Sequence, residues 1–398
     1  MLAEKEKCTG CGSCAVSCPN NCITMAANSE GFRFPLLDIK KCVNCQLCVK
    51  SCPILTGLSV SEETEIIAAK NRNVKVRSNS SSGGIFWNLA ESVIAEGGVV
   101  CAAQYDEEFT VVHAIAQTIS QIAAFQGAKY AQSKVEHCFC EIKNLLEDGI
   151  KVLFVGTPCQ TAGIYKYLKR QYDNLILIDT ICHGVPSPKV WKIYLNERRS
   201  KDAGGSEISR VNLRSKSTGW SYYTYSVEVI YKNGTIYSVR QNEDEFMQGF
   251  VNNLYLRNSC SNCKFKGIQR CSDLTLGDYW GVWEQYPQFD DNQGCSLLMI
   301  HTDKGSQIWN GVKSQFEVIR VDENDALKSN PSALYSSSSH RRRADFFRGM
   351  ENGEEVIPLI QGLLVKNRSE KSSNLLVRSK ILDYVQLIIK RLKGKKNE

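Results

Sequence analysis

Cysteine residues carry the clearest chemical signal in this sequence of 398 residues, which contains 18 cysteines but only 5 histidines. Eight of the cysteines form two copies of the pattern CxxCxxCxxxCP near the start of the chain. Three thiolates spaced in this way along a tight loop can hold three corners of one 4Fe-4S cluster, while the fourth cysteine reaches the other cluster. The spacing therefore predicts two clusters, the first held by Cys8, Cys11, Cys14 and Cys52 and the second by Cys42, Cys45, Cys48 and Cys18.

The double repeat resembles the bacterial two-cluster ferredoxin, in which two neighbouring clusters form a path for electrons. The alternative is a pair of zinc sites, but these normally combine four ligands per ion with longer intervals between the cysteine pairs. Cys22 falls outside the repeat, and we interpret it as a small buried residue. The polar segment from Ser59 to Glu65 is expected to link this N-terminal domain to the remainder of the chain.

Two further cysteines are predicted to lie at the edge of a parallel sheet. Cys159 and Cys182 each follow an apolar run typical of a fully buried strand, and the segment between the runs has the length of a crossover helix. Ligands gather at the carboxyl ends of such neighbouring strands. A CxxC pair much later in the chain would complete a third 4Fe-4S site, with the ligands Cys159, Cys182, Cys260 and Cys263.

Two alternatives to this third site remain open from the residues alone. Cys271 follows the CxxC pair closely enough to compete for the place of the fourth ligand. Alternatively, Cys159 and Cys182 are small residues in tight turns, and the CxxC pair binds zinc or nothing.

A glycine- and serine-rich turn from Ser78 to Gly84 precedes an amphipathic segment and then an apolar strand. Free backbone N–H groups at a helix start, together with serine hydroxyls, can bind phosphate. The simpler interpretation is an N-cap and a flexible turn. The motif alone does not decide between the two.

The motifs together resemble the coenzyme F420 hydrogenase/dehydrogenase beta-subunit family, preceded by a 4Fe-4S ferredoxin domain. The resemblance extends over roughly residues 1 to 345. The motifs that carry it occur in this order: the ferredoxin-like start, SSSGG, GAKYAQS from Gly127, GTPCQ from Gly156, CHGVPSP from Cys182, the CxxCKFKG segment and TLGDYWG from Thr275.

This resemblance implies an iron–sulfur flavoprotein in which FAD lies beside a 4Fe-4S cluster and exchanges hydride with coenzyme F420. It also implies that the four later cysteines hold a third 4Fe-4S cluster. By motif, Ser81, Ser82, Gly83 and Gly84 would cradle the FAD phosphates, and Lys129, Tyr130 and Ser133 would contact the cofactor. A flavin accepts two electrons as hydride and releases them singly, so no separate catalytic acid or base is assigned. His183 is more simply a structural residue, and Asp278 a turn former. The turn Lys232-Asn233-Gly234 is expected to close a hairpin.

The elements that must position these residues are predicted to form a chain of mixed class, α+β / α/β. Composition favours a globular protein, with 42% hydrophobic and 23% charged residues. We expect a ferredoxin-like domain over residues 1–60, a mixed α/β domain binding FAD and an iron–sulfur cluster over 66–345, and a basic helical tail over 346–398. The formal net charge of +7 resides entirely in the residues from Lys366 onward, which argues against a basic body that binds nucleic acid.

The predicted function is an iron–sulfur flavoprotein oxidoreductase that passes electrons between its clusters and FAD and exchanges hydride with F420 or another small molecule. One alternative is an electron-transfer subunit without a substrate site; another is a reductase of a sugar-derived substrate linked to surface-polysaccharide synthesis. Expected partners are ferredoxin or another redox protein and a small-molecule hydride donor or acceptor. The tail would keep the protein soluble, or contact a membrane surface or an acidic partner. The sequence start shows no signal peptide, so we expect a cytoplasmic protein.

Overall fold

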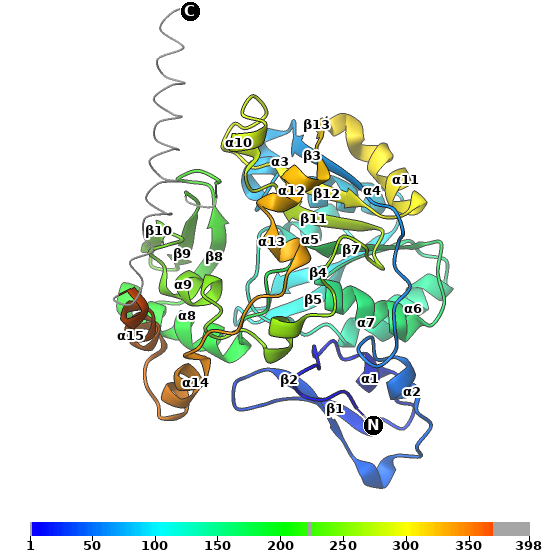
Figure 1. Ribbon diagram of the computed structural model, residues 1–398, viewed down its shortest axis with the longest axis horizontal. Coiled ribbons are helices and arrows are strands. Elements are labelled where there is room, and N and C mark those ends of the chain that lie inside the picture. The colour runs from blue at the N-terminus through cyan, green and yellow to red at the C-terminus, as the bar shows by residue number, and fades with distance from the viewer. Residues whose placement is uncertain (1, 222–223, 369–398) are drawn as a thin grey trace, which may run out of the picture.

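The computed structural model describes residues 2–221 and 224–368 of the chain, and its centre is an eight-stranded mixed sheet (Figure 1). The strand order is β13-β3-β12-β11-β7-β6-β4-β5. Strands β4, β6, β7 and β11 run parallel to one another, whereas β5 at one edge and β12, β3 and β13 at the other pair in antiparallel fashion. The eight strands are β3 (Glu65–Asn71), β4 (Val99–Tyr105), β5 (Val111–Ala116), β6 (Val152–Val155), β7 (Leu175–Thr180), β11 (Leu274–Asp278), β12 (Ser296–Ile300) and β13 (Phe316–Arg320).

Helices cover both faces of this sheet because its central strands alternate apolar side chains to each side. One face packs against α4 (Ile85–Ala95) and α11 (Asp303–Val312). The other face packs against α6 (His137–Glu147) and α7 (Pro158–Leu168), which bury side chains against β4, β6 and β7. The two apolar runs that precede Cys159 and Cys182 are strands β6 and β7, which are parallel neighbours as predicted.

A smaller sheet and a group of helices form a second layer beside the main sheet (Figure 1). The order of this sheet is β10-β9-β8, and its β9–β10 hairpin closes at the predicted Lys232-Asn233-Gly234 turn. The strands are β8 (Ile208–Ser215), β9 (Ser226–Tyr231) and β10 (Ile236–Arg240), and the helices are α8 (Pro188–Ala203), α9 (Glu245–Val251), α14 (Arg343–Glu351) and α15 (Val356–Arg368).

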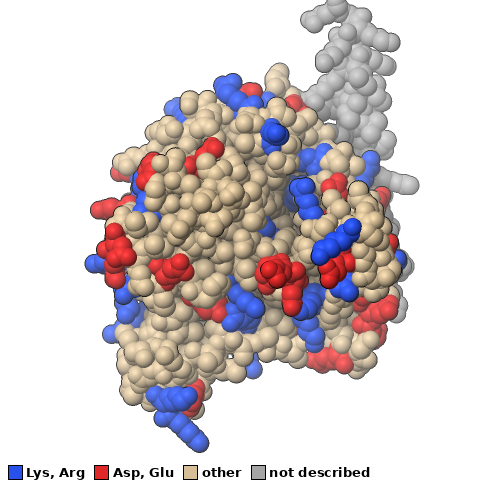
Figure 2. Space-filling model, turned by 180° about the vertical axis from the view of Figure 1, so that it is seen from behind, with Lys and Arg blue, Asp and Glu red and all other residues tan. Residues whose placement is uncertain are grey.

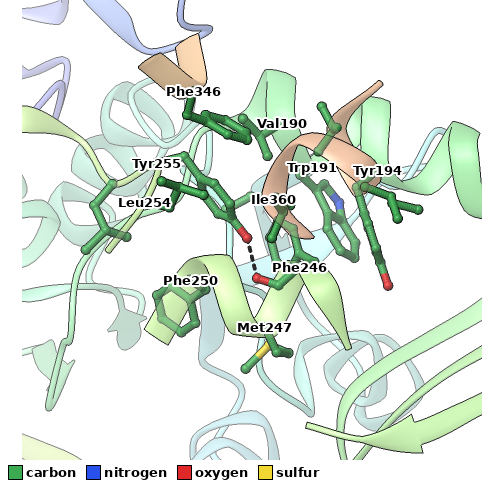
Figure 3. Packing of buried hydrophobic residues seen from close by; sticks show 14 of the residues in the cluster. Val190, Trp191, Tyr194, Phe246, Met247, Phe250, Leu254, Tyr255, Phe346 and Ile360 are labelled. Atoms are coloured by element: carbon green, nitrogen blue, oxygen red, sulfur yellow. Dashed lines mark hydrogen bonds between the residues drawn. The ribbon is translucent and has the colours of Figure 1, made fainter. Parts of the chain in front are cut away.

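Aromatic side chains fill the core between these helices (Figure 3). Trp191 and Tyr194 of α8 lie against Phe246 of α9, and the Tyr255 hydroxyl donates a hydrogen bond to the Phe246 carbonyl. Phe346 of α14 and Ile360 of α15 close the same cluster. The predicted tail therefore begins with two helices that pack into the core, whereas residues 369–398, which make up most of the predicted basic tail, lie outside the described residues.

The N-terminal domain lies below the main sheet, beside α6 and α7 (Figure 1). It has a β1–β2 hairpin and three single-turn helices, and its two cysteine repeats flank the hairpin. Its elements are α1 (Ser13–Val16), β1 (Ile23–Ala27), β2 (Arg33–Leu37), η1 (Ile39–Lys41) and α2 (Leu47–Lys50). The remaining short helices of the chain are α3 (Val74–Asn79), α5 (Ile119–Ile122), η2 (Ala123–Phe125), η3 (Asn258–Asn262), α10 (Val282–Gln285), η4 (Lys313–Gln315), α12 (Glu323–Lys328) and α13 (Pro331–Leu334).

Ion pairs tie the N-terminal domain to the body. Arg343 of α14 forms two parallel hydrogen bonds with the Glu30 carboxylate, at 2.8 and 2.5 Å. Arg33 lies 2.5 Å from Glu136, at the start of α6. Both pairs are partly buried, so they are shielded from salt better than exposed pairs. No helix in the described part of the chain is long and apolar enough to cross a membrane.

Candidate functional site

The structure brings the first predicted set of cysteines together around one small cavity. The loop that leads into α1 supplies three of them, and the fourth comes from the end of the second repeat. The lining cysteines are Cys8, Cys11, Cys14 and Cys52, and Cys48 of the second predicted set lines the cavity as well. Burial, with the thiols of Cys8 and Cys52 nearby, raises the pKa of Cys11 to about 12. A thiol with this pKa stays protonated at neutral pH, so a cationic centre such as the iron of a cluster is needed to hold these side chains as thiolates.

The second predicted set lies nearer the surface. Cys42 and Cys45 are exposed, and Cys48 is partly buried. Cys18 lies beside Cys22, with the two sulfur atoms 3.1 Å apart. Cys22 is buried, as predicted, but the structure also places it next to a predicted ligand and near Cys42. The sequence did not indicate this proximity, because Cys22 stands outside the repeat.

The third predicted set lines a second small cavity. Cys159 begins α7 directly after β6, Cys182 follows β7, and Cys260 and Cys263 lie in and just after η3. All four line the same cavity. Cys271 does not line it, and the charged groups nearest to Cys271 are Asp179, Arg270 and Asp273. Within the described residues, no group of three or more His, Cys, Asp or Glu side chains is arranged to hold a single metal ion.

Three cationic side chains line the cavity of the third set. Arg257 and Arg270 are only 2% and 5% exposed, and neither forms an ion pair within the described residues. Each has a buried nitrogen without a hydrogen-bond partner, Nη2 of Arg257 and Nε of Arg270. The third cation is Lys266, whose Nζ donates to the carbonyl oxygens of Cys182 and Ser332. Buried cations need anionic partners, and an iron–sulfur cluster with four thiolates is an anion, so the residues fit such a group.

The first and third cysteine sets lie close to each other across the boundary between the N-terminal domain and the body. Arg257 donates from Nε to the Cys8 carbonyl oxygen at 2.8 Å, while its backbone N–H donates to Val185 near the third set. A Cβ added to Gly163 of α7 would lie 2.8 Å from Cys11 Cβ, so only glycine permits this approach. The guanidinium of Arg257 thus stands between the two sets.

A large cavity of about 1030 Å³ opens beside the third set, between the carboxyl ends of the parallel strands and the smaller sheet. Cys159 and Cys182 line both cavities. Ligand sites usually measure about 300–1,000 Å³, so this cavity has the size expected for a large cofactor. Six of the seven predicted FAD contacts line it: Ser81, Ser82, Gly84, Lys129, Tyr130 and Ser133.

Gly83 does not line the large cavity. Its N–H donates to the Ser296 hydroxyl, and a Cβ at this position would lie 2.4 Å from the Ala69 carbonyl oxygen. Its absent side chain lets the turn pack tightly on the sheet. Gly84 follows with a φ of 89° and forms the N-cap of α4 without any side-chain cap. The first N–H groups of α4 are therefore open to an anionic group in the cavity.

Arg214 and Asp278 form an ion pair in the wall of the cavity, near the serine turn, at 2.8 Å. Arg214 also donates to the Ser81 carbonyl and lies over the ring of Trp280. Lys216 donates to the carbonyl oxygens of Arg77, Ser82 and Gln293, which fixes the turn from the other side. Sequence reasoning missed both basic residues, since neither belongs to a motif and only the fold brings them to the turn. Asp278 holds Arg214 in place, which is more specific than the predicted turn role.

Lys129 and Ser133 hold the cavity wall through their own hydrogen bonds. The Lys129 ammonium donates to three carbonyl oxygens, those of Phe125, Gln126 and Gly127. The Ser133 hydroxyl lies 2.9 Å from His113 Nδ1 and accepts a hydrogen bond from Gln160 Nε2 at 2.8 Å. Predicted as cofactor contacts, both residues also set the shape of the cavity. His183 lines the cavity too, with Nε2 2.6 Å from the Asn253 side-chain oxygen.

His113 gives this wall a pH dependence. Its Nε2 donates to the Val155 carbonyl, so Nδ1 accepts from Ser133, and burial lowers the pKa of His113 to about 4. In the unfolded chain this histidine has an ordinary pKa of about 6.5. Between about pH 6.5 and about pH 4 the unfolded state therefore binds more protons than the folded state, so stability falls as the pH drops through this range. Between pH 7 and pH 5, the free energy of unfolding of the wild type should fall by about 2 kcal/mol more than that of His113→Gln.

Urea unfolding followed by tryptophan fluorescence at the two pH values measures this difference. Glutamine keeps a donor for Val155 and an acceptor for Ser133, so the pH dependence is isolated from the loss of the hydrogen bonds. Equal pH dependence in the two proteins would contradict the assignment of a neutral His113.

Comparison with known proteins supports two parts of this description. Residues 7–55 match the family model for a 4Fe-4S dicluster domain, and residues 149–324 match the model for the C terminus of the coenzyme F420 hydrogenase/dehydrogenase beta subunit. The resemblance predicted from the motifs is therefore confirmed, as are the ferredoxin-like 4Fe-4S domain at the N-terminus and the mixed α/β body. A comparison with curated protein sequences gives no match.

One similar solved structure comes from the F420-reducing [NiFe] hydrogenase complex of Methanosarcina barkeri, studied by xenon derivatization. The matched chain is 17% identical, with a TM-score of 0.44, and the match covers 69% of this chain and 91% of that chain.

Proposed function

We propose that this iron–sulfur oxidoreductase-like protein carries electrons through three 4Fe-4S clusters to an FAD in the large cavity. The observation that carries the proposal is that Cys159 and Cys182 belong to the walls of two adjoining cavities, one lined by four cysteines and one of cofactor size. A cluster in the first would adjoin a flavin in the second. The proposed ligands are the twelve cysteines that the sequence predicts.

The order of the sites supports a continuous path. In the second set Cys42 and Cys45 are exposed, in the first set Cys8 and Cys11 are buried, and the first set meets the third across Arg257. The third set adjoins the large cavity. Electrons cross proteins in short steps between neighbouring redox groups, so each cluster would pass electrons to the next one along the path. The path would connect a partner at the surface with a two-electron carrier inside the protein.

In the large cavity, the residues present fit an FAD molecule. The uncapped start of α4 and the hydroxyls of Ser81 and Ser82 would bind its phosphates, with Arg214 and Lys216 as cations that contact the turn. The bound flavin would supply the conversion between hydride transfer and single-electron transfer. Tyr130 stacks on Phe250 with ring centroids 4.7 Å apart, which would keep a rigid apolar wall beside the cofactor.

The small-molecule partner of this flavin is proposed to be F420 or another hydride carrier. A cavity of about 1030 Å³ is larger than a pure relay would need, and it favours an enzyme with a substrate site over a subunit that only relays electrons. No residue is assigned as a catalytic acid or base, because hydride transfer to a flavin requires correct positioning more than proton transfer.

The test is anaerobic purification followed by reduction with F420H2, NAD(P)H and reduced ferredoxin in turn, with flavin absorbance as the readout. The protein should contain about one FAD and about twelve iron atoms per chain. Bleaching by ferredoxin and by one of the two hydride donors is the expected result. Protein that binds iron but no flavin under any condition would contradict the proposal and favour a relay role.

A further inference from the structure

The most exposed stretch of the N-terminal domain lies over the second cysteine set. Every residue from Leu36 to Gln46 is exposed, and this segment contains Cys42 and Cys45. Large apolar side chains account for much of it: Ile39 is 78% exposed, Val43 66% and Leu36 57%. Apolar side chains so exposed and so close in sequence usually mark an interaction surface.

The charged side chains of this segment are also mostly basic. Lys40, Lys41 and Lys50 are exposed, whereas Asp38 is the only acidic residue between Leu36 and Leu55. Asp38 lies 3.4 Å from Lys41, and it also accepts a hydrogen bond from the Lys40 backbone N–H, at the start of η1. The charges of Lys40 and Lys50 remain without an acidic partner within this segment. Figure 2 shows the N-terminal domain at the lower edge, where basic side chains project beside a broad uncharged area.

We infer that residues 36–46, with Lys50 and Leu55, form the docking surface for an acidic one-electron carrier protein. The inference rests on the proposed function, because it assumes a cluster held by Cys42 and Cys45. An apolar centre with a basic rim is complementary to an acidic carrier whose own redox centre lies near its surface. Docking here would bring the two redox centres together over the exposed cysteines, at the end of the path that is most distant from the large cavity.

A membrane surface is the other occupant that an apolar and basic patch can attract. The position of the exposed cysteines favours the protein, since a lipid surface would cover the entry point for electrons. A second copy of this chain is less suitable, because two basic rims would repel each other. The experiment distinguishes these occupants.

The test uses the full-length protein with its clusters and compares two electron donors by anaerobic stopped flow. The donors are an acidic two-cluster ferredoxin, reduced with dithionite, and reduced methyl viologen. Ile39→Asp and the double variant Lys40→Glu/Lys50→Glu should each lower the second-order rate constant with ferredoxin about tenfold or more. The rate with methyl viologen should stay within about twofold, because a small donor needs no docking surface.

Matched controls lie elsewhere on the surface. Ile236→Asp replaces an exposed apolar residue of β10, and Lys313→Glu reverses an exposed charge of η4. Both should leave the ferredoxin rate unchanged. Rising ionic strength should slow the wild type but should accelerate the charge-reversed variant, because screening then weakens its repulsion from the acidic carrier.

Several outcomes would overturn the inference. These are unchanged ferredoxin rates in the docking variants, equal losses in the controls, binding to anionic phosphatidylcholine/phosphatidylserine vesicles that Ile39→Asp abolishes, or a dimer that Ile39→Asp dissociates. Failure of the proposed function gives a different result, because the clusters or the flavin would then not be reduced by methyl viologen either. A chain whose clusters accept electrons from ferredoxin while no flavin is reduced would support the docking surface and contradict only the flavin.

Discussion

Replacement of Cys263 by alanine should lower the iron content from about twelve to about eight atoms per chain, with the two N-terminal clusters intact. Cys263 is the suitable position because it lines the cavity of the third set but not the large cavity. Its loss removes one of the four proposed cluster ligands beside the buried side chains of Arg257 and Arg270. Reduction of the proposed flavin by ferredoxin should fall to background, because the proposed electron path is then interrupted next to it.

Cys271→Ala is the matched control for this substitution. Cys271 follows the same CxxC segment, is partly buried as Cys263 is, and does not line the cavity. It should retain about twelve iron atoms and full flavin reduction. Iron and acid-labile sulfide analysis, together with electron paramagnetic resonance of the reduced protein, measures both variants. If Cys271→Ala loses iron while Cys263→Ala retains it, the fourth ligand is Cys271 and not Cys263.

Replacement of Ser81 by aspartate should weaken FAD binding about a hundredfold while the fold is retained. The new carboxylate would lie in the turn where the FAD phosphates are proposed to bind, and juxtaposed like charges cost several kcal/mol. A cost of about 3 kcal/mol corresponds to about a hundredfold weaker binding. The thermal midpoint should not fall, because an acidic residue before the start of α4 interacts favourably with the helix dipole.

Ser81→Ala is the control, since it removes the hydroxyl without adding charge. It should weaken FAD binding by about tenfold or less. Flavin content after anaerobic reconstitution and fluorescence titration with FAD measure both variants. Full FAD content in Ser81→Asp would show that the phosphates lie elsewhere in the cavity.

Local patterns were sufficient to predict those parts of the protein whose ligands are close in sequence. The spacing of the first repeat predicted that Cys8, Cys11 and Cys14 lie close together, and in the structure these three residues line one cavity with Cys52. The β6 and β7 strands were predictable as parallel neighbours, since a buried apolar run followed by one crossover helix leaves few alternatives. The hairpin at Asn233-Gly234 followed from its turn residues.

Most contacts between segments that are distant in sequence could not be predicted, the third cysteine set being the exception. Strand β3 enters the main sheet between β12 and β13, which come more than two hundred residues later. Arg214 reaches the Ser81 turn only because the smaller sheet packs beside the main one. Arg257 carries no motif, yet it joins the first and third cysteine sets. Gly83 looked like a phosphate contact because it belongs to a glycine pair, but its missing Cβ serves packing against β3.

The attachment of the N-terminal domain to the body determines what kind of electron carrier this protein can be. The Arg343–Glu30 and Arg33–Glu136 pairs, with the bond from Arg257 to Cys8, hold the domain at three separate points. A tethered carrier must swing between donor and acceptor, so its turnover slows as the solvent becomes more viscous. Here the domain is clamped in place, and its clusters stay at a constant distance from the body. Solvent friction should then limit only the encounter with the external partner, whereas the internal steps proceed at the same rate in glycerol as in water.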